Sequence, residues 1–278
     1  MIKIGNYNKL KVIKELDFGI YVDGEELGEI LVPKRYVPEN CQIDDVIDVF
    51  IYFDSEDRVI ATTQKPYAVV GEFAFLKVVS VSNVGAFLDW GLQKDLFVAF
   101  REQKHKMKEN EFYTVFVYID KQTTRIAASS ELNKFLSDDP YDFEIREQVD
   151  LLIFEKTDIG YKAIINNSHQ GILYNNEVFQ TLEKGQKIKG FIQKIREDKK
   201  IDLCLHKSGY AKIDNVAQQI INKLKKQNGF MLVTDKSSPK IIYDLFQISK
   251  KTYKKAVGDL YKKRLISIKK NGIKLIEK

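Results

Sequence analysis

The sequence predicts a mainly β chain with a C-terminal α+β domain: three tandem five-stranded OB-fold barrels followed by a winged helix-turn-helix. Three observations lead to this prediction. The sequence matches itself without a gap at an offset of 66 residues, each copy consists of short runs rich in Val, Ile, Phe and Tyr, and after Asp214 the apolar residues recur with a period of about 3.6. Five short strands in about 65 residues is the size of a partly open OB barrel.

The repeat matches glycine and charged positions as well as apolar ones. Gly19 falls on Gly85 and Asp23 on Asp89, and a fainter third copy places Gly160 on Gly85 at an offset of 75. Other pairs at the offset of 66 are Gly5 with Gly71, Val12 with Val78, Ile30 with Leu96, Val32 with Val98 and Arg35 with Arg101. The polar, proline-containing residues 137–142 fit the inserted stretch as a linker. We therefore predict modules at residues 1–65, 66–137, 143–210 and 211–278.

Strand composition and turn residues place the elements of each barrel. The strands expected in the first copy lie at residues 9–15, 20–23, 29–32, 46–53 and 59–62, and the second copy ends with strands at 113–119 and 125–129. Gly19, Asp23-Gly24 and residues 54–57 break the first copy. Because units of this size are close to the lower limit for independent folding, we expect contacts between modules to help stabilise them.

Helical periodicity and capping residues define the fourth module. An apolar stripe from Val216 to Leu224 stops at Asn228-Gly229, Ser238-Pro239 starts a second helix, and Ser249 caps a third. The apolar faces expected on the second and third helices are Ile241, Ile242, Leu245 and Phe246, and Tyr253, Val257, Leu260 and Tyr261. Strands at 265–269 and 273–276, joined by the turn Asn271-Gly272, complete the predicted winged helix.

A motif surrounds the repeated glycine. The first copy reads Phe18-Gly19-Ile20-Tyr21-Val22-Asp23, then Ile30-Leu31-Val32, then Asp54 with Arg58; the second reads Val84-Gly85-Ala86-Phe87-Leu88-Asp89, then Leu96-Phe97-Val98, then Asp120 with Arg125. This pattern resembles the S-one-type RNA-binding domain, the OB module repeated in a bacterial ribosomal small-subunit protein. Three such domains before a winged helix resemble, more narrowly, the conserved virulence factor B family of RNA-binding regulators. The resemblance implies post-transcriptional control of gene expression, including virulence factors.

The resemblance also implies which residues face RNA: two aromatics flanking the glycine, the residue ending the third strand, and an Asp/Arg pair. In the first copy these are Phe18, Tyr21, Val32, Asp54 and Arg58, in the second Val84, Phe87, Val98, Asp120 and Arg125, and in the third Ile159, Lys162, Tyr174, Arg196 and Lys200. Val84 replaces an aromatic, Val32 and Val98 stand where the family often has histidine, and Arg125 lies five residues after Asp120 rather than four. In the third copy a cationic face (Lys162, Lys194, Arg196, Lys199, Lys200) either holds phosphates beside Tyr161 or Tyr174 or belongs to a degenerate spacer.

Two roles remain open for the aromatic side chains. OB folds bind single strands by stacking bases on exposed aromatics, but a small barrel also needs Phe and Tyr in its core. Phe18 and Tyr21 are three apart, which in a regular strand means opposite faces, unless a bulge at Gly19 brings them together. Trp90, at a strand end, is open to both packing and stacking.

The net charge of +6 is unevenly distributed. Residues 211–278 hold 17 Lys and Arg and 5 Asp and Glu, a net of +12, whereas residues 1–210 have a net of −6. The outward cations expected on the third helix and the wing are Lys250, Lys251, Lys254, Lys255, Lys262, Lys263, Arg264, Lys269, Lys270 and Lys274. Lysine clusters attract phosphate but specify little sequence, so we expect general affinity for a nucleic-acid backbone, with protein docking as the alternative.

The sequence carries no convincing catalytic or metal motif, and we expect no enzyme activity and no cofactor. His105, His169 and His206 are far apart, Cys204 is expected to be a buried strand residue, and two cysteines argue against a secreted disulfide scaffold. Without a signal-peptide core or a membrane-length apolar run, we expect a cytoplasmic protein. The leading hypothesis is a single-stranded RNA-binding protein. The alternatives are a DNA-binding transcription regulator and an adaptor associated with ribosomes or a ribonuclease.

Overall fold

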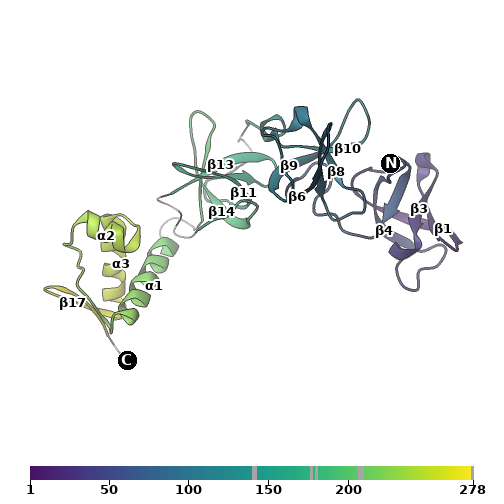
Figure 1. Ribbon diagram of the computed structural model, residues 1–278. Helices are drawn as coiled ribbons and strands as arrows, with labels where there is room; N and C mark the ends of the chain where they lie inside the picture. The colour runs from purple at the N-terminus through teal and green to yellow at the C-terminus, as the bar shows by residue number, and fades with distance from the viewer. Residues whose placement is uncertain (140–142, 176–177, 179–180, 206–209, 277–278) are drawn as a thin grey trace. The chain divides into compact units, whose positions relative to one another are not determined.

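The computed structural model describes residues 1–139, 143–175, 178, 181–205 and 210–276, with the side chains of 210–215 outside the description. It has the predicted fold class, with three five-stranded β units and a C-terminal winged helix (Figure 1). The chain forms two compact units, residues 1–136 with the first two barrels and residues 137–278 with the third barrel and the winged helix. The exact limits of the four modules stay predictions.

The first barrel contains β1 (Tyr7–Leu16), β2 (Gly19–Asp23), β3 (Glu29–Pro33), β4 (Val46–Phe53) and β5 (Val59–Thr62). The strands close in the order β1-β2-β3-β5-β4, with β3 and β5 parallel and the other pairs antiparallel. Alternate residues such as Val12, Val22 and Val32 point inward and form the core. All five strands overlap the predicted ones because the period-two pattern and the turn residues are strong local signals.

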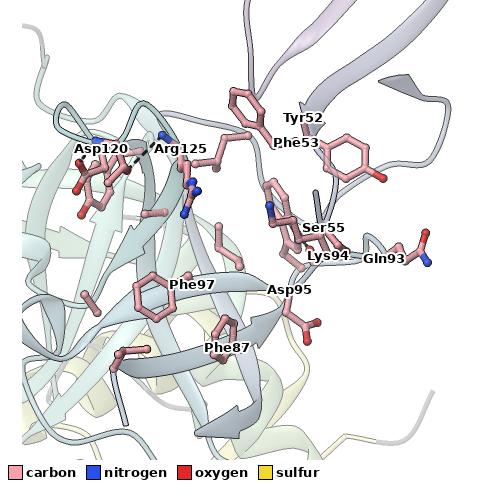
Figure 2. A pocket seen from close by; sticks show the side chains of 18 of the residues that line it. Tyr52, Phe53, Ser55, Phe87, Gln93, Lys94, Asp95, Phe97, Asp120 and Arg125 are labelled. Carbon is pink, nitrogen blue, oxygen red and sulfur yellow. Dashed lines mark hydrogen bonds between the residues drawn. The ribbon is translucent and has the colours of Figure 1, made fainter. Parts of the chain in front are cut away.

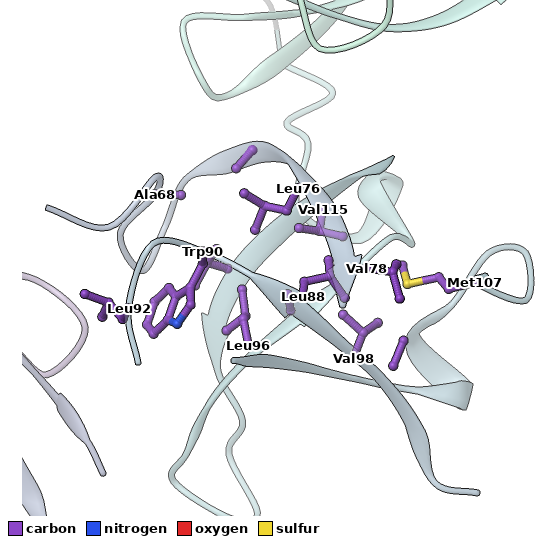
Figure 3. Packing of buried hydrophobic residues seen from close by; sticks show 14 of the residues in the cluster. Ala68, Leu76, Val78, Leu88, Trp90, Leu92, Leu96, Val98, Met107 and Val115 are labelled. Atoms are coloured by element: carbon purple, nitrogen blue, oxygen red, sulfur yellow. The ribbon is translucent and has the colours of Figure 1, made fainter. Parts of the chain in front are cut away.

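The second barrel contains β6 (Phe73–Val81), β7 (Gly85–Asp89), β8 (Leu96–Ala99), β9 (Phe112–Ile119) and β10 (Ile126–Ser129). The hydrogen-bonded order is β10-β9-β6-β7-β8, and β8 lies next to β10 without a ladder between them. Leu76, Leu88, Leu96 and Val115 fill its centre (Figure 3). The same cluster includes Phe50 from β4, so the first two barrels share buried apolar contacts as expected for modules this small.

The third barrel contains β11 (Gln148–Thr157), β12 (Gly160–Ile165), β13 (His169–Tyr174), β14 (Lys187–Ile195) and β15 (Ile201–Cys204), closed in the same order as the first. Cys204 is buried, as predicted. His169 is buried too: its Nδ1 lies 2.8 Å from the Ser168 hydroxyl, and its Nε2 donates to the Asp139 carbonyl oxygen at 2.5 Å. Part of the predicted linker is thus bound to this barrel, and His169 has a structural role. His206 lies outside the described residues.

The glycine that opens the second strand of each barrel is required by close packing. A Cβ atom on Gly19, Gly85 or Gly160 would lie 2.1–2.3 Å from a carbonyl oxygen of the neighbouring strand. No Cβ tolerates such a distance, and a backbone oxygen within a ladder cannot move away cheaply. The sequence repeat therefore marks one backbone contact that occurs three times.

Irregular pairing occurs in the first strand of each barrel rather than at this glycine. The register shifts between Val12 and Lys14, between Val78 and Ser80, and between Ile153 and Glu155. The bulge that the sequence left open at Gly19 is therefore not present there, since Gly19 pairs regularly with Leu16. A bulge bends its strand and increases the local twist, which helps a five-stranded sheet to close.

The winged helix contains α1 (Tyr210–Lys226), β16 (Phe230–Met231), α2 (Pro239–Phe246), α3 (Lys250–Lys262), β17 (Ile266–Lys269) and β18 (Gly272–Leu275). Ser238 and Ser249 accept hydrogen bonds from Ile241 and Thr252 N–H groups, so both predicted caps are confirmed. Short 3-10 turns occur in the first two barrels at Glu25–Leu27, Lys34–Tyr36, Phe100–Glu102 and Leu132–Lys134.

Three details of this domain differ from the sequence prediction. Tyr261 and Ile241 are exposed rather than inward, because each lies at the edge of its helix's apolar stripe. Lys269 pairs with Gly272, so the wing turn is Lys270-Asn271 rather than Asn271-Gly272. Gly272 is needed elsewhere, since its Cβ would lie 2.3 Å from the Met231 carbonyl oxygen of β16.

Candidate nucleic-acid interface

The first barrel presents Phe18 and Tyr21 on one side, as the RNA-binding hypothesis requires. Phe18 lies in the β1–β2 turn and is 55% exposed, and its ring meets the half-buried Tyr21 ring edge-on with centroids 6.2 Å apart. Lys14 Nζ lies 5.4 Å from the centroid of Tyr21. A ring beside a cation is the combination that receives a base and its phosphate. The turn, rather than a bulge, brings the two aromatics together.

Val32 and Val98 do not face solvent, and the expectation that they contact nucleic acid is wrong. Both are fully buried in their barrel cores. They pair with Ile20 and Ala86, which are core residues as well. Alternation then directs the intervening residues of the third strand outward.

The outward residue in the second barrel is Phe97, which sequence reasoning missed. Phe97 pairs with Phe87 across β7 and β8, and their ring centroids are 5.2 Å apart. The corresponding pair in the first barrel is Tyr21 and Leu31. The signal was present, because Phe97 lies one residue before the matched Val98, on the opposite face of a two-residue period.

Asp54 and Arg58 form the predicted pair, but the carboxylate also holds its own turn. Arg58 Nε donates to Asp54 Oδ2 at 2.8 Å, while the Glu56 and Arg58 N–H groups donate to Oδ1 at 2.9 Å each. Burial acts to raise the pKa of Asp54, yet these hydrogen bonds and the Arg58 charge outweigh it and hold the pKa below its ordinary value. The Arg58 side chain is exposed, and its outer side pairs with the exposed Glu56 at 3.0 Å, so a phosphate that approaches Arg58 would have to displace that carboxylate.

Asp120 and Arg125 do not pair with each other. Asp120 accepts the N–H groups of Gln122 and Thr123 at 2.8 and 3.0 Å, which lowers its pKa, and it lies 3.4 Å from Arg101. Arg125 instead pairs with Asp57 of the first barrel. The extra residue between Asp120 and Arg125 accounts for the change, because the longer turn no longer brings the guanidinium back to its aspartate.

Except for the buried Val98, the predicted residues of the second barrel line one pocket of about 700 Å³ (Figure 2). Val84, Phe87 and Phe97 supply apolar wall, and Arg125 and Arg101 supply positive charge. A smaller pocket of about 300 Å³ lies beside Arg58 and Arg35 of the first barrel and is also lined by Gln93 and Lys94 of the second. Arg101 and Arg35 match in the repeat and were not among the predicted site residues.

Trp90 packs rather than stacks. Its ring is buried and meets Phe50 of β4 edge-on with centroids 5.8 Å apart, and its Nε1 donates to the Lys94 carbonyl oxygen at 2.6 Å. Packing was one of the two roles left open by the sequence.

The third barrel has a more polar face. Lys162 is half-buried and pairs with Glu155 at 3.1 Å, Lys200 pairs with Asp198 at 2.9 Å, and Arg196 contacts both Asp202 and the Tyr174 hydroxyl. Tyr161 is buried in the core, which excludes it as a stacking residue. Tyr174, with the Arg196 guanidinium 5.8 Å from its ring centroid, is the stacking candidate that remains.

The predicted lysine face of the winged helix is exposed with one exception. Exposed side chains are Lys251, Lys254, Lys255 and Lys262 on α3, and Lys269, Lys270 and Lys274 on the wing. Lys250 is half-buried, and its Nζ donates to the Lys236 carbonyl oxygen at 3.3 Å. Lys250 therefore belongs to the domain's own packing more than to its outer face.

Among the described residues, no group of His, Cys, Asp and Glu is arranged to hold a metal ion. Within the same part of the chain, no helix is long and apolar enough to cross a membrane.

Comparison with known proteins gives three kinds of similarity. The family model described as S1 domain matches residues 4–64 and 70–129, and the model described as CvfB-like winged helix domain matches residues 218–275. The protein YitL of Bacillus subtilis is 26% identical over 269 residues, covering 93% of this chain and 89% of YitL. Proteins named conserved virulence factor B from Staphylococcus epidermidis and Staphylococcus aureus are each 23% identical, covering 86% of this chain and 83% and 82% of theirs. A crystal structure of a multidomain protein with nucleic acid binding domains from Streptococcus pneumoniae is 24% identical and covers 98% of both chains, with a TM-score of 0.43.

Proposed function

The chain belongs to the conserved virulence factor B family, and from that premise we propose that it is a non-enzymatic protein that binds single-stranded RNA. The observation that carries the proposal is the pairing of rings with cations on the barrels: Tyr21 beside Lys14, and Phe87 with Phe97 in a pocket that Arg125 also lines. Base stacking on such rings contributes roughly 1–3 kcal/mol per base and tolerates most sequences.

The winged helix adds attraction for the phosphate backbone. The exposed face of α3 carries lysines and no Asn or Gln that would read adenine, so it adds affinity for phosphates more than base specificity. Because the modules are covalently linked, a strand held by one module meets the next at high effective concentration. We infer from this arrangement and from the family name that the chain acts in the cytoplasm on RNA, in post-transcriptional regulation that includes virulence factors.

The test compares binding of the intact chain to a single-stranded RNA, a single-stranded DNA of the same sequence and a duplex DNA, each at two salt concentrations. We expect the single-stranded RNA to bind most tightly and every affinity to fall with salt. A preference for duplex DNA would overturn the proposal.

A second candidate is a DNA-binding regulator, which the exposed lysines of α3 favour, because this helix is the usual groove reader in such folds. Under that alternative, replacing Lys254 and Lys255 with Gln would abolish binding while Phe87→Ala would leave it unchanged.

A further inference from the structure

The larger pocket is built by two barrels rather than one. The second barrel supplies Phe87, Phe97 and Arg125, and the first barrel supplies Tyr52, Phe53 and Ser55 at the end of β4. Figure 2 shows these first-barrel side chains across the pocket from the strands that carry Phe87 and Phe97. A volume of about 700 Å³ lies within the range of roughly 300–1,000 Å³ typical of small-ligand sites.

The junction that forms this pocket is packed as a core. Phe50 and Trp90 meet in the shared apolar cluster, and Val70 N–H donates to the Gly5 carbonyl oxygen at 2.8 Å across the two barrels. A Cβ on Gly5 would lie 2.1 Å from a methyl group of Val70, so the contact admits no larger residue there. The pocket is therefore pre-formed, and a ligand would not need to bring the barrels together.

One carboxylate of the first barrel is paired with the cations beside the pocket. Asp57, in the β4–β5 turn, pairs with Arg125 and, at 3.1 Å, with Lys94 Nζ. Lys94 also donates to the Asp54 carbonyl oxygen at 2.6 Å. The Arg125 guanidinium, which the family resemblance implies to face RNA, thus already contacts a carboxylate of the first barrel. Carboxylate and phosphate oxygens make the same charge-assisted contact with arginine, so they compete for it.

We propose that this pocket is a nucleotide subsite shared by both barrels, in which a base packs on Phe87 and Phe97 and its phosphate takes the place of the Asp57 carboxylate beside Arg125. This inference rests on the proposed RNA binding. It adds a specific subsite for one nucleotide and identifies Asp57 as a residue that opposes binding of RNA at that subsite. Asp57 lowers affinity because its contact with Arg125 must be broken before the phosphate can take its place.

The test measures binding of the full chain to a single-stranded uridylate RNA with Asp57→Asn and with the matched control Asp48→Asn. Asp48 is an exposed residue of β4 and is absent from the pocket lining, so both variants remove one negative charge from the same barrel. We expect D57N to tighten binding roughly two- to fivefold, the size of one exposed ion pair, and D48N to change it little. In an Arg125→Ala background the gain from D57N should disappear, because the guanidinium for which the Asp57 carboxylate and the RNA phosphate compete is then absent.

The only tryptophan of the chain provides a second readout without any substitution. Trp90 lines the pocket while its ring packs on Phe50 at the junction of the two barrels, so its fluorescence reports changes in packing beside the pocket. We expect uridylate RNA to change Trp90 emission in parallel with binding. Equal effects of D57N and D48N, a gain that persists in R125A, or saturated binding with unchanged Trp90 emission would each overturn the shared subsite while leaving RNA binding intact. A chain that binds no RNA in any variant would overturn the proposed function instead.

Discussion

At the scale of single residues, the repeated glycine and the repeated aromatic have different roles. Gly85 is fixed by the Val98 carbonyl oxygen, whereas Phe87, two residues later, is half-buried and lines a pocket. The repeat therefore records one contact that maintains the barrel and one side chain available to a ligand. Substitutions at the two positions should separate stability from binding.

Gly85→Ala is expected to destabilise the second barrel by about 1–3 kcal/mol, the usual cost of forcing extra atoms into a packed region. The new Cβ would lie 2.3 Å from the Val98 carbonyl oxygen and 2.7 Å from an atom of the Phe97 ring. Gly258→Ala in α3 is the control, since nothing lies within 4 Å of its Cβ. That change should stabilise the helix by about 0.5–1 kcal/mol. Thermal unfolding measures whether each variant is less or more stable than wild type. Equal changes in stability for the two variants would contradict the close-contact explanation.

Phe87→Ala is expected to weaken RNA binding by roughly 1–3 kcal/mol, because one base loses its stacking surface. Phe112→Ala is the matched control: Phe112 is an exposed phenylalanine of the same barrel that stacks on Phe75 and does not line the pocket. Fluorescence anisotropy with a labelled RNA measures both affinities. Similar losses for the two variants would show that Phe87 acts through stability alone.

At the scale of elements, strands and helices follow the sequence closely, while turns and pairings do not. The period-two pattern predicts the strand β4, and the period-3.6 pattern predicts the buried face of the helix α3. Both patterns can be seen in the local sequence, because each records which face of the element is buried. The turns depend on neighbours: Gly272 looks like a turn residue in sequence, but close approach of β16 explains it. The Arg125–Asp57 pair joins residues 68 apart, and no local pattern shows it.

Asp54→Asn should loosen the β4–β5 turn by about 1 kcal/mol at neutral pH, since the carboxylate accepts two backbone N–H groups and the Arg58 guanidinium. The folded pKa of Asp54 lies below its ordinary value of 3.8, so its stabilising contribution is complete above that value. The contribution is lost as pH falls through the folded pKa. The difference in unfolding free energy between wild type and variant should therefore shrink in acid.

Glu56→Gln is the control for that turn. Glu56 pairs only with the outer side of Arg58, at 3.0 Å, and both side chains are largely exposed. Exposed pairs contribute about 0–1 kcal/mol, so E56Q should stay near wild type. A D54N effect that does not diminish at low pH would contradict the assignment to the carboxylate.

The third helix has its own prediction. Lys254→Gln with Lys255→Gln should lower affinity for all single strands alike and reduce the salt slope by about 0.7 per lost phosphate contact. Lys225→Gln with Lys226→Gln, at the exposed end of α1, removes the same charge from the same domain. Binding titrations at several salt concentrations distinguish the pairs. If both slopes fall equally, net charge rather than the α3 face attracts the phosphates.

At the scale of the whole molecule, charge and aromatic surface are divided between modules. The first 210 residues carry a net charge of −6 and the two barrels with paired surface rings, while the last 68 carry +12. The composition predicts the division of charge, because it needs no coordinates, whereas the sequence left open whether the rings lie on the surface or in the core. The shared core of the first two barrels was expected only in general terms, because nothing in the sequence indicates that Phe50 meets Trp90.

This division predicts a steep dependence of affinity on RNA length. A short uridylate that reaches one module gains either stacking or phosphate attraction, whereas a long one gains both through linkage. In wild type, the long oligonucleotide should bind more tightly than the short one by a factor larger than its greater number of possible binding positions along the strand would give. In K254Q/K255Q, and separately in F87A, that ratio should fall because one of the linked contacts is weakened. Anisotropy titrations with the two lengths measure it, and an equal loss at both lengths would mean that the modules bind RNA independently.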